Sequence, residues 1–549
     1  MLPPISCLSV FYMTLQRMIQ FISSIRQKHS LVTGAALTII ALIGAGLRFY
    51  RLGSQPLWLD EAFSVWMGSH SIADIIRLTI DIDQHPPVYH ILLHIWMALG
   101  GSSEFWVRSL SALLGIFTII VIYFFGKTVG GKRVGIIAAI ILAFSSFHVE
   151  FSQESRAYAL LTFCAGMAMW MTAVILTDRR SSTHKIGQTF LYELRRRQFD
   201  REALAGASID LAWLGYMFFT AMTVYSNNTA VLFPFAVNLF VLGLIIFRRS
   251  VTARDGQLQP PSFRNWWLAQ IGVLLFLSPW IIPFFIQMVG VVEDFWIQPP
   301  TLEVAFAAIQ EFLFAFIPER IQFQQWIWAA LCGLLFLSFV RYQKKQAHFY
   351  FLGAMFLTPF LGELLASLWR PIFYDRTLIW CTLPLYILIA AGISQLRFRS
   401  YTITALLILL TISALSLANY YTYYEKERWD LGARYVVEKA QPGDIMIFNA
   451  GWAQIPFDYY FSRYNHPIDE IGAPDTMFDN GVLEPKMTEK DVPRLQKTLK
   501  GRTRVWLIYS HNWWTDPKAL IQQTLRKNYK LIDIRNYLGM QIQLYGTRK

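Results

Sequence analysis

Two adjacent carboxylates stand shortly after the first hydrophobic stretch, in the segment RFYRLGSQPLWLDEAFSVW at residues 48–66. Asp60 and Glu61 lie between Trp58 and Phe63, where few polar neighbours are available to solvate them. A charged group in apolar surroundings is costly, so such a pair marks a candidate functional site, and a carboxylate there can act as a general base. The pattern predicts proton removal from a hydroxyl group at this point.

Further polar side chains follow later in the same loop and at three other breaks between apolar stretches. Each break lies a few residues from the end of a predicted helix, so the side chains can converge on one cavity. Carboxylates together with a histidine suit a divalent metal, whereas arginines suit phosphate. The segments are TIDIDQHPPVYH with Asp83 and His85, FSQESRAYAL with Gln153, Glu154, Arg156 and Tyr158, YSNNT with Asn227 and Asn228, and RPIFYDRT with Arg370, Tyr374, Asp375 and Arg376.

This combination indicates the transfer of a group from a lipid phosphate. Soluble activated sugars are not normally available outside the cell, so a transferase on the outer face needs a donor that the membrane carries. The plain alternative for each side chain is a solvated loop residue or an anchor at the membrane surface. That alternative is strongest for Glu104, Arg370 and Asp375 taken singly, and His90 and His94 fit an interfacial helix better than a metal site.

The composition requires that these residues be positioned by membrane helices. Of the 549 residues, 54% are hydrophobic and only 15% are charged, whereas soluble proteins carry about 25% charged residues. The apolar residues form blocks of the length that crosses a bilayer. The net charge of +13 is spread over the ends of these blocks rather than pooled on one surface, so nucleic acid is not an expected partner.

Twelve apolar stretches are candidates for membrane spans. Counting all twelve places Lys127, Lys132 and Arg133 on the opposite side from Arg26 and Lys28, against the positive-inside rule. The stretch 86–100 is short and opens with two prolines, which favours a helix in the interface. The remaining eleven predicted spans are 31–49, 106–126, 133–149, 157–177, 209–225, 229–247, 266–288, 324–340, 349–368, 377–395 and 401–418.

With eleven spans, every basic break falls on one side of the membrane, which predicts a cytoplasmic N-terminus and an extracytoplasmic C-terminus. The polar breaks described above then share the outer face. We therefore expect a cytoplasmic segment (1–30), a membrane domain (31–418) whose first outer loop (50–105) holds interfacial helices, and a C-terminal outer domain (419–549).

The tail after residue 419 has the pattern of a small α/β domain. Predicted helices and predicted strands alternate along it, and no glycine-rich phosphate loop is present. The expected helices are 429–440, 454–462, 489–499 and 517–528, and the expected strands are 444–449, 504–509, 530–534 and 539–545.

Four motifs together resemble the membrane-embedded GT-C glycosyltransferases. The bacterial branch of the protein mannosyltransferase and lipid A aminoarabinose transferase superfamily is the most similar group. The motifs are LWLDEAFS at 57–64, DIDQHPPVYHILLH at 81–94, GSSEFWVRSLSALLG at 101–115 and FSQESRAYAL at 151–160.

The resemblance implies an inverting transfer of a sugar from a polyprenyl-phosphate donor to a hydroxyl of a lipid, glycan or protein acceptor. The expected location is the extracytoplasmic face of a bacterial inner (plasma) membrane. Asp60 matches the catalytic acid residue of the family, and Glu61 is its expected partner. The other implied roles are metal contacts (Mg, Mn or Zn) by Asp83, His85 and Glu154, donor-phosphate contacts by Arg108, Arg156 and Arg376, and cavity walls from Trp58, Gln153, Tyr158, Asn228 and Tyr374.

Two other functions compete with this interpretation. A transporter or flippase for a lipid or sugar would show charged residues at mid-span, internal repeats or broken helices, and the sequence has no internal repeat. A non-catalytic membrane scaffold would use the outer domain for binding alone. A change of Asp60 to Asn separates the three, because only a transferase depends on that carboxylate for turnover.

Overall fold

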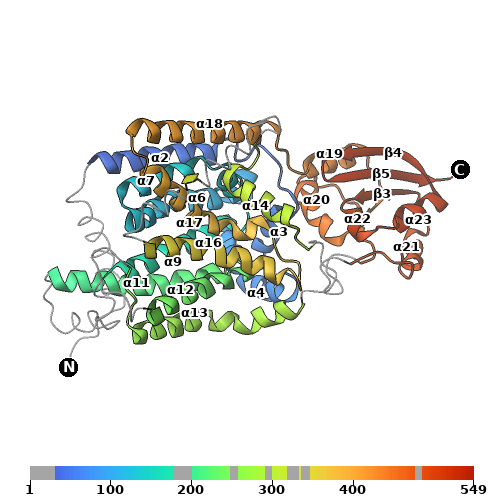
Figure 1. Ribbon diagram of the computed structural model, residues 1–549. Helices are drawn as coiled ribbons and strands as arrows, with labels where there is room; N and C mark the ends of the chain where they lie inside the picture. The colour runs from blue at the N-terminus through green and yellow to red at the C-terminus, as the bar shows by residue number, and fades with distance from the viewer. Residues whose placement is uncertain are drawn as a thin grey trace, which may run out of the picture.

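The computed structural model describes residues 31–83, 85–178, 201–247, 258–290, 299–317, 333–334, 346–475 and 485–548. A bundle of helices makes up the larger part, and a five-stranded sheet flanked by helices lies at one end of it (Figure 1). The predicted fold class, a mainly helical multi-pass membrane protein with a small C-terminal α/β unit, is confirmed. The predicted cytoplasmic segment 1–30 falls outside the described residues.

Among the described residues, eight helical segments are long and apolar enough to cross a membrane, or nine if one bent pair counts as a span. The bent pair is α7 (Lys132–Phe144) and α8 (Ser146–Ser152). The eight are α2 (Leu31–Phe49), α6 (Glu104–Gly130), α9 (Tyr158–Thr177), η2 with α12 (Asn228–Val231 and Leu232–Phe247), α13 (Phe263–Gly290), α16 (Gln346–Ala366), η5 with α17 (Asp375–Cys381 and Thr382–Ser394) and α18 (Arg399–Tyr423).

Nine of the eleven expected spans coincide with the eight helical segments and the bent pair. The stretch 209–225 lies in α11 (Arg201–Val224), whose apolar part, Ile209–Val224, is shorter than these segments. The stretch 324–340 lies almost wholly outside the described residues.

The first loop folds into three short helices, α3 (Leu59–Gly68), α4 (Ile72–Asp81) and α5 (Val88–Gly100). Ser71 begins α4 by accepting a hydrogen bond from the backbone N–H of Asp74, and Ser103 does the same for Trp106 in α6. The 13 residues of α5 rise by only about 20 Å, too little to cross a hydrocarbon core of about 30 Å. This length agrees with the exclusion of the stretch 86–100 from the predicted spans.

A bend of 62° separates α7 from α8. Arg48, buried at the end of α2, donates to the carbonyl groups of Leu142 and Ala143, each at 3.3 Å, and to the hydroxyl of Ser152 at 3.1 Å. These carbonyl groups close α7 and would otherwise lack partners. Gly115 leaves room for the arrangement, because a Cβ there would lie 2.2 Å from the Ser152 hydroxyl oxygen.

The C-terminal sheet has the strand order β2-β1-β3-β5-β4. β1 is parallel to both β2 and β3, whereas β5 is antiparallel to β3 and β4. The strands are β1 (Ile445–Phe448), β2 (Asp469–Gly472), β3 (Arg504–Tyr509), β4 (Tyr529–Tyr537) and β5 (Met540–Thr547). The helices include α19 (Trp429–Lys439), α20 (Gln454–Phe461), α21 (Val492–Leu499), α22 (Asn512–Thr515) and α23 (Leu520–Asn528).

This sheet unit is attached to the first loop by side chains of α20 and the turn after it. The backbone N–H of Leu57 donates to the hydroxyl of Tyr460 at 2.7 Å, and Tyr459 donates to the carbonyl of Ser102 at 2.6 Å. An ion pair of 2.9 Å joins Arg463 to Glu104. The contacts hold the end of the sheet unit against α3 and the start of α6, as Figure 1 shows.

Candidate active site

Glu61 is the buried member of the carboxylate pair. Its side chain is fully enclosed and receives two hydrogen bonds of 2.7 Å from the guanidinium of Arg108. The ammonium group of Lys426 lies 3.0 Å from the same carboxylate, and the backbone N–H of Ser155 donates to it at 2.9 Å. Glu61 therefore joins the first loop to three other segments, which are α6, the break before α9 and the linker to the sheet unit.

The surroundings of Glu61 keep it ionised. Burial raises the pKa of its carboxyl group, but the charges of Arg108 and Lys426 outweigh burial and bring the pKa to about 2. A carboxylate that holds its charge and has all its oxygens engaged is a poor proton acceptor at neutral pH. The position of Glu61 accordingly suits the structural role expected of it rather than the chemical step.

The side chain of Asp60, in contrast to that of Glu61, is accessible to solvent. Its side chain is 25% exposed, and its outer oxygen lies 3.7 Å from Nη2 of Arg156 and 3.5 Å from Nη1 of Arg376. Both separations exceed those of charge-assisted hydrogen bonds, which measure about 2.7–2.9 Å. Nη1 of Arg156 instead donates to the Asp60 backbone carbonyl and to the Ser64 hydroxyl, each at 3.4 Å. The Asp60 carboxylate therefore lies beside both guanidinium groups without a short hydrogen bond to either.

Three aromatic rings surround the guanidinium of Arg376. The distances from its central carbon to the ring centres are 4.5 Å for Tyr374, 5.5 Å for Tyr158 and 5.8 Å for Trp58. Such cation–π contacts favour the charged guanidinium and fix its plane. Tyr374 directly precedes η5, Tyr158 begins α9 and Trp58 directly precedes α3. Three segments that are distant in the sequence therefore meet at one arginine.

Two donors at this site, Nε1 of Trp58 and Nε of Arg156, are buried and have no hydrogen-bond partner among the described residues. A buried unpaired donor costs free energy, and native proteins leave few of them. An anionic ligand between Arg156 and Arg376 would satisfy the arginine. The arrangement places two guanidinium groups and a carboxylate side by side.

The expected metal ligands are not brought together. Asp83 accepts hydrogen bonds from Nδ1 of His85 at 3.0 Å and Nε2 of His90 at 2.9 Å, whereas Glu154 faces Lys426 at 3.4 Å. Burial raises the pKa of Asp83, but the two histidines outweigh it and the pKa is lowered. In the part of the chain that the structure describes, no three or more His, Cys, Asp or Glu side chains are grouped to hold a metal ion. The residues present do not fit a three-ligand metal centre.

Three other expected site residues have structural partners in the folded chain. Arg108, expected at the donor phosphate, is 1% exposed and also donates to the carbonyl groups of Leu52, Gln55 and Pro56. Gln153 bonds the carbonyl groups of Arg48 and Tyr50, which end α2. Asn228 donates to Gln287 at 2.7 Å, and Gln287 in turn bonds the backbone of Thr79 and Asp83.

Lys426 is a site residue that the sequence pattern did not identify. It follows the last membrane helix in YYTYYEKERW, where a lysine is typical of an anchor at the membrane surface. In the structure it is 5% exposed and lies between the carboxylates of Glu61 and Glu154. Burial raises the pKa of Glu154, and the charge of Lys426 opposes that effect. No local signal relates a residue beyond position 420 to the first loop.

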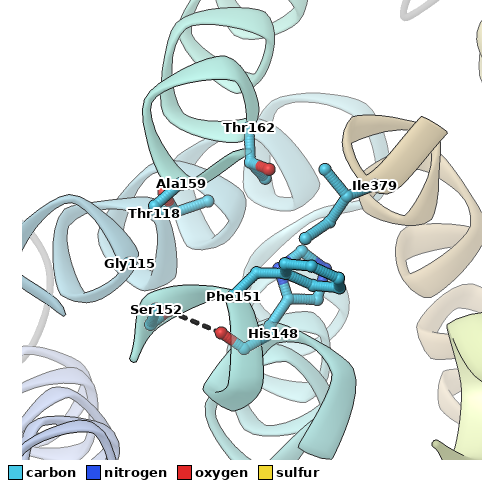
Figure 2. Close-up of a pocket in the computed structure, with 8 residues that line it drawn as sticks. All are labelled: Gly115, Thr118, His148, Phe151, Ser152, Ala159, Thr162 and Ile379. Carbon is cyan, nitrogen blue, oxygen red and sulfur yellow. Dashed lines mark hydrogen bonds between the residues drawn. The ribbon is translucent and has the colours of Figure 1, made fainter. Parts of the chain in front are cut away.

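A separate small cavity lies deeper among the helices (Figure 2). Nε2 of His148 forms a hydrogen bond of 2.6 Å with the hydroxyl of Thr382. The hydroxyl of Ser152 donates to the carbonyl of His148 at 2.5 Å. The cavity is lined by Gly115, Thr118, His148, Phe151, Ser152, Ala159, Thr162 and Ile379. The hydroxyls of Thr118 and Thr162 donate to backbone carbonyl groups one turn earlier in their own helices. The polar groups that line the cavity thus already have partners, and the cavity belongs to the packing near the bend between α7 and α8.

Comparison with known proteins is informative for the fold and for part of the sequence. A family model described as dolichyl-phosphate-mannose-protein mannosyltransferase matches residues 84–187. This segment includes Arg108, Glu154 and Arg156 but ends well before Arg376. Among curated proteins, none matches the chain.

Solved structures match almost the whole chain. ArnT from Cupriavidus metallidurans in the apo state aligns with a TM-score of 0.61 at 13% identity, covering 94% of this chain and 98% of that one. The same protein bound to undecaprenyl phosphate gives 0.55 at 11% identity, with coverage of 94% and 98%. The Archaeoglobus fulgidus oligosaccharyltransferase tethered with an acceptor peptide gives 0.50 at 11% identity, with coverage of 95% and 74%. The resemblance to the GT-C glycosyltransferases is confirmed at the level of the fold.

Proposed function

We propose that this protein is an inverting glycosyltransferase that moves a sugar from a polyprenyl-phosphate donor to an acceptor hydroxyl at the outer membrane face. The observation that carries the proposal is the group formed by Asp60, Arg156 and Arg376. It places a partly exposed carboxylate 3.7 and 3.5 Å from two guanidinium groups, and Nε of Arg156 has no hydrogen-bond partner among the described residues. The similar ArnT structure bound to undecaprenyl phosphate supports a lipid phosphate as the ligand.

The chemical step requires one base and one anion site. Asp60 takes the proton of the acceptor hydroxyl while the hydroxyl oxygen forms a bond to the anomeric carbon. The bond from that carbon to the phosphate oxygen breaks at the same time, and its electron pair leaves with the polyprenyl phosphate. Arg156 and Arg376 stabilise the charge that develops on the phosphate. Attack opposite to the leaving group inverts the configuration of the sugar.

Phosphate binding also frees Asp60 for its role. In the absence of ligand, the negative charge of Asp60 serves as the counterion of the two arginines. When a phosphate takes up their donors, its own charge replaces that of Asp60 as their counterion. The carboxylate is then the nearest proton acceptor for an incoming hydroxyl, at the accessible side of the site.

Glu61, Arg108 and Lys426 hold this geometry in place. Glu61 lies next to Asp60 in α3, and its bonds to Arg108 and to the Ser155 backbone fix α3 against the segment that carries Arg156. Bidentate contact between a carboxylate and an arginine restrains both side chains in one orientation. These three side chains act as supports, whereas Asp60, Arg156 and Arg376 carry out the chemical step.

The orientation in the membrane is part of the proposal. The helix ends next to the candidate active site face the outside of the membrane. The C-terminal sheet unit lies on the same side. Ser102, at the site end, and Ser400, at the start of α18, are both exposed. When each is replaced by cysteine, a membrane-impermeant thiol reagent added outside intact cells labels position 102 and leaves position 400 unlabelled. The reverse pattern contradicts the proposed orientation.

Mass spectrometry of envelope lipids and glycoproteins, from cells with and without the protein, tests the function. The proposal predicts a glycan species that depends on the protein and disappears with the Asp60→Asn variant. A scaffold or a transporter would keep its effect in that variant, because neither needs the carboxylate as a base. An identical glycan profile in the two kinds of cells, under conditions where the protein is made, contradicts the proposal.

A further inference from the structure

The carboxyl ends of β1 and β3 form a distinct edge of the C-terminal sheet. The two strands are parallel neighbours, yet the chain leaves β1 toward β2 on one side and leaves β3 toward β4 and β5 on the other. Crevices at such topological switch points are where α/β sheets bind ligands. Asn449 and Ser510 join the two strand ends by two hydrogen bonds of 2.7 and 2.8 Å.

His511, two residues after the end of β3, presents an acceptor nitrogen at this edge. Its φ angle of 48° is in the left-handed region, which a histidine adopts at a cost that functional sites tend to retain. The hydroxyl of Ser510 donates to the carbonyl of Gly539 at 2.7 Å and also lies 2.8 Å from Nδ1 of His511. Since the single hydroxyl proton is used, Nδ1 carries the ring proton and Nε2 is left with a lone pair.

Two further polar groups accompany Nε2 of His511. The ring of Trp452 lies 5.0 Å from the histidine ring, and its Nε1 donor is buried without a hydrogen-bond partner in the described part of the chain. Oε1 of Glu427 lies 3.7 Å from Nε2, too far for a direct hydrogen bond. Burial lowers the pKa of His511, which keeps the ring neutral, although the charge of Asp60 acts in the opposite direction.

Glu427 links this edge to the backbone of the residue before Asp60. Its other oxygen accepts a hydrogen bond of 3.0 Å from the backbone N–H of Leu59, the residue before Asp60. Trp429 donates to the same oxygen at 2.7 Å. The edge of the sheet is therefore held against the first turn of α3.

We propose that His511, Trp452 and Glu427 form the acceptor-binding site, and that the acceptor group is a sugar ring with several free hydroxyls. The inference rests on the proposed function and names its acceptor class. A hydroxyl both donates and accepts, so neighbouring sugar hydroxyls can satisfy an imidazole lone pair, a carboxylate and an indole N–H together. A lone serine or threonine hydroxyl would leave most of these groups unpaired.

The test compares variants of the full-length protein in cells that otherwise lack it. His511→Asn removes Nε2 while keeping a residue that tolerates the left-handed backbone, and Trp452→Phe removes the indole donor but keeps a ring. His466→Asn, elsewhere in the sheet unit, is the matched control. We expect the protein-dependent glycan to fall at least about tenfold with His511→Asn and several-fold with Trp452→Phe, and to stay unchanged in the control.

A second measurement separates acceptor binding from the donor site and from folding. Stabilisation of the purified variants by undecaprenyl phosphate, read as the shift in melting temperature, should equal that of the wild type. Full glycan formation with His511→Asn overturns the inference, as does a transferred sugar found only on serine or threonine. If His511→Asn fails to fold, the Trp452→Phe result decides. If the wild-type protein itself makes no glycan, the proposed function fails, and this inference fails with it.

Discussion

Asp60 and Glu61 are neighbours in the sequence, yet their carboxylates occupy opposite environments. Glu61 is wholly buried with Arg108 and Lys426 around it. The Asp60 side chain is a quarter exposed, and its carboxylate lies 3.7 Å from Arg156 and 3.5 Å from Arg376. The division follows from their successive positions at the start of α3, because adjacent helical side chains point about 100° apart. One turn of helix thus provides both a fixed support and an accessible base.

Replacing Glu61 by Gln should destabilise the fold more than any change at Asp60. The substitution leaves the buried charges of Arg108 and Lys426 without their common partner, a loss typically of about 3–5 kcal/mol. Unfolding of the purified protein in detergent measures this change. Glu438→Gln, in an exposed pair with Arg434, is the matched control and should have little effect. Equal stability of the Glu61→Gln variant and the wild type would contradict the assigned support role.

The same carboxylate should give a recognisable acid titration. The pKa of Glu61 is lowered from 4.5 to about 2 in the folded protein, so the stabilisation is complete above pH 4.5 and is lost as the pH falls toward 2. The stability difference between wild type and Glu61→Gln should be constant from pH 7 to pH 6 and smaller by about 2 kcal/mol at pH 3. A difference that grows on acidification would show that Glu61 is not held in its ionised form.

Arg156 and Arg376 should account for the affinity for lipid phosphate. A hydrogen bond to a charged group contributes about 1.5–3 kcal/mol, so Arg376→Met should weaken undecaprenyl phosphate binding about 10- to 100-fold. Arg376→Lys should also lose most of the affinity that Arg376 provides, because an ammonium group cannot reproduce the flat contact of the guanidinium with Tyr374 and Tyr158. Titration followed by tryptophan fluorescence gives the dissociation constants.

The exposed Arg397, which lies over Phe398, supplies the control for these titrations. Arg397→Lys should bind undecaprenyl phosphate as the wild type does. If Arg376→Met and Arg156→Met both retain wild-type affinity, the phosphate site is elsewhere in the molecule.

Lys426 should couple the linker of the sheet unit to two carboxylates at once. Lys426→Met leaves Glu154 buried without its cation and weakens the support of Glu61. The double variant Lys426→Met, Glu154→Gln should recover more than half of the lost stability, because the second change removes the uncompensated charge. The exposed pair of Lys518 and Glu489 should show no such coupling. Purely additive losses in the Lys426 series would contradict the proposed contact.

Local patterns were sufficient to predict most of the helices and strands. Apolar blocks of spanning length predict α6, α9 and α13, and the expected strand 504–509 matches β3 to the residue. The edge strand β2 was missed because Asp469–Gly472 is short and partly exposed, with no alternating pattern. The number of membrane spans is harder to predict from the sequence, because hydropathy does not show how a helix such as α7 bends or what surrounds α11.

The candidate site could be predicted only where its residues lie in short motifs. Asp60, Arg156 and Arg376 stand out as charges at the ends of apolar blocks, and the structure brings them together. Arg108 has the same kind of position but is enclosed by carbonyl groups, a distinction that needs the folded loop. Lys426 and His511 reach the site from the far end of the chain, and no spacing rule relates them to residue 60.

The central claim is that Asp60 is the base of a sugar transfer, and one comparison tests it most directly. Cells that lack the chain are supplied with wild type, Asp60→Asn or Asp81→Asn, the last being an exposed acid of the same loop. At equal protein levels in the membrane, the account predicts that Asp60→Asn forms about 10²- to 10⁴-fold less protein-dependent glycan than wild type. The variant should keep its melting temperature and its binding of undecaprenyl phosphate, and Asp81→Asn should be fully active. Glycan formation by Asp60→Asn at the wild-type level would contradict the account.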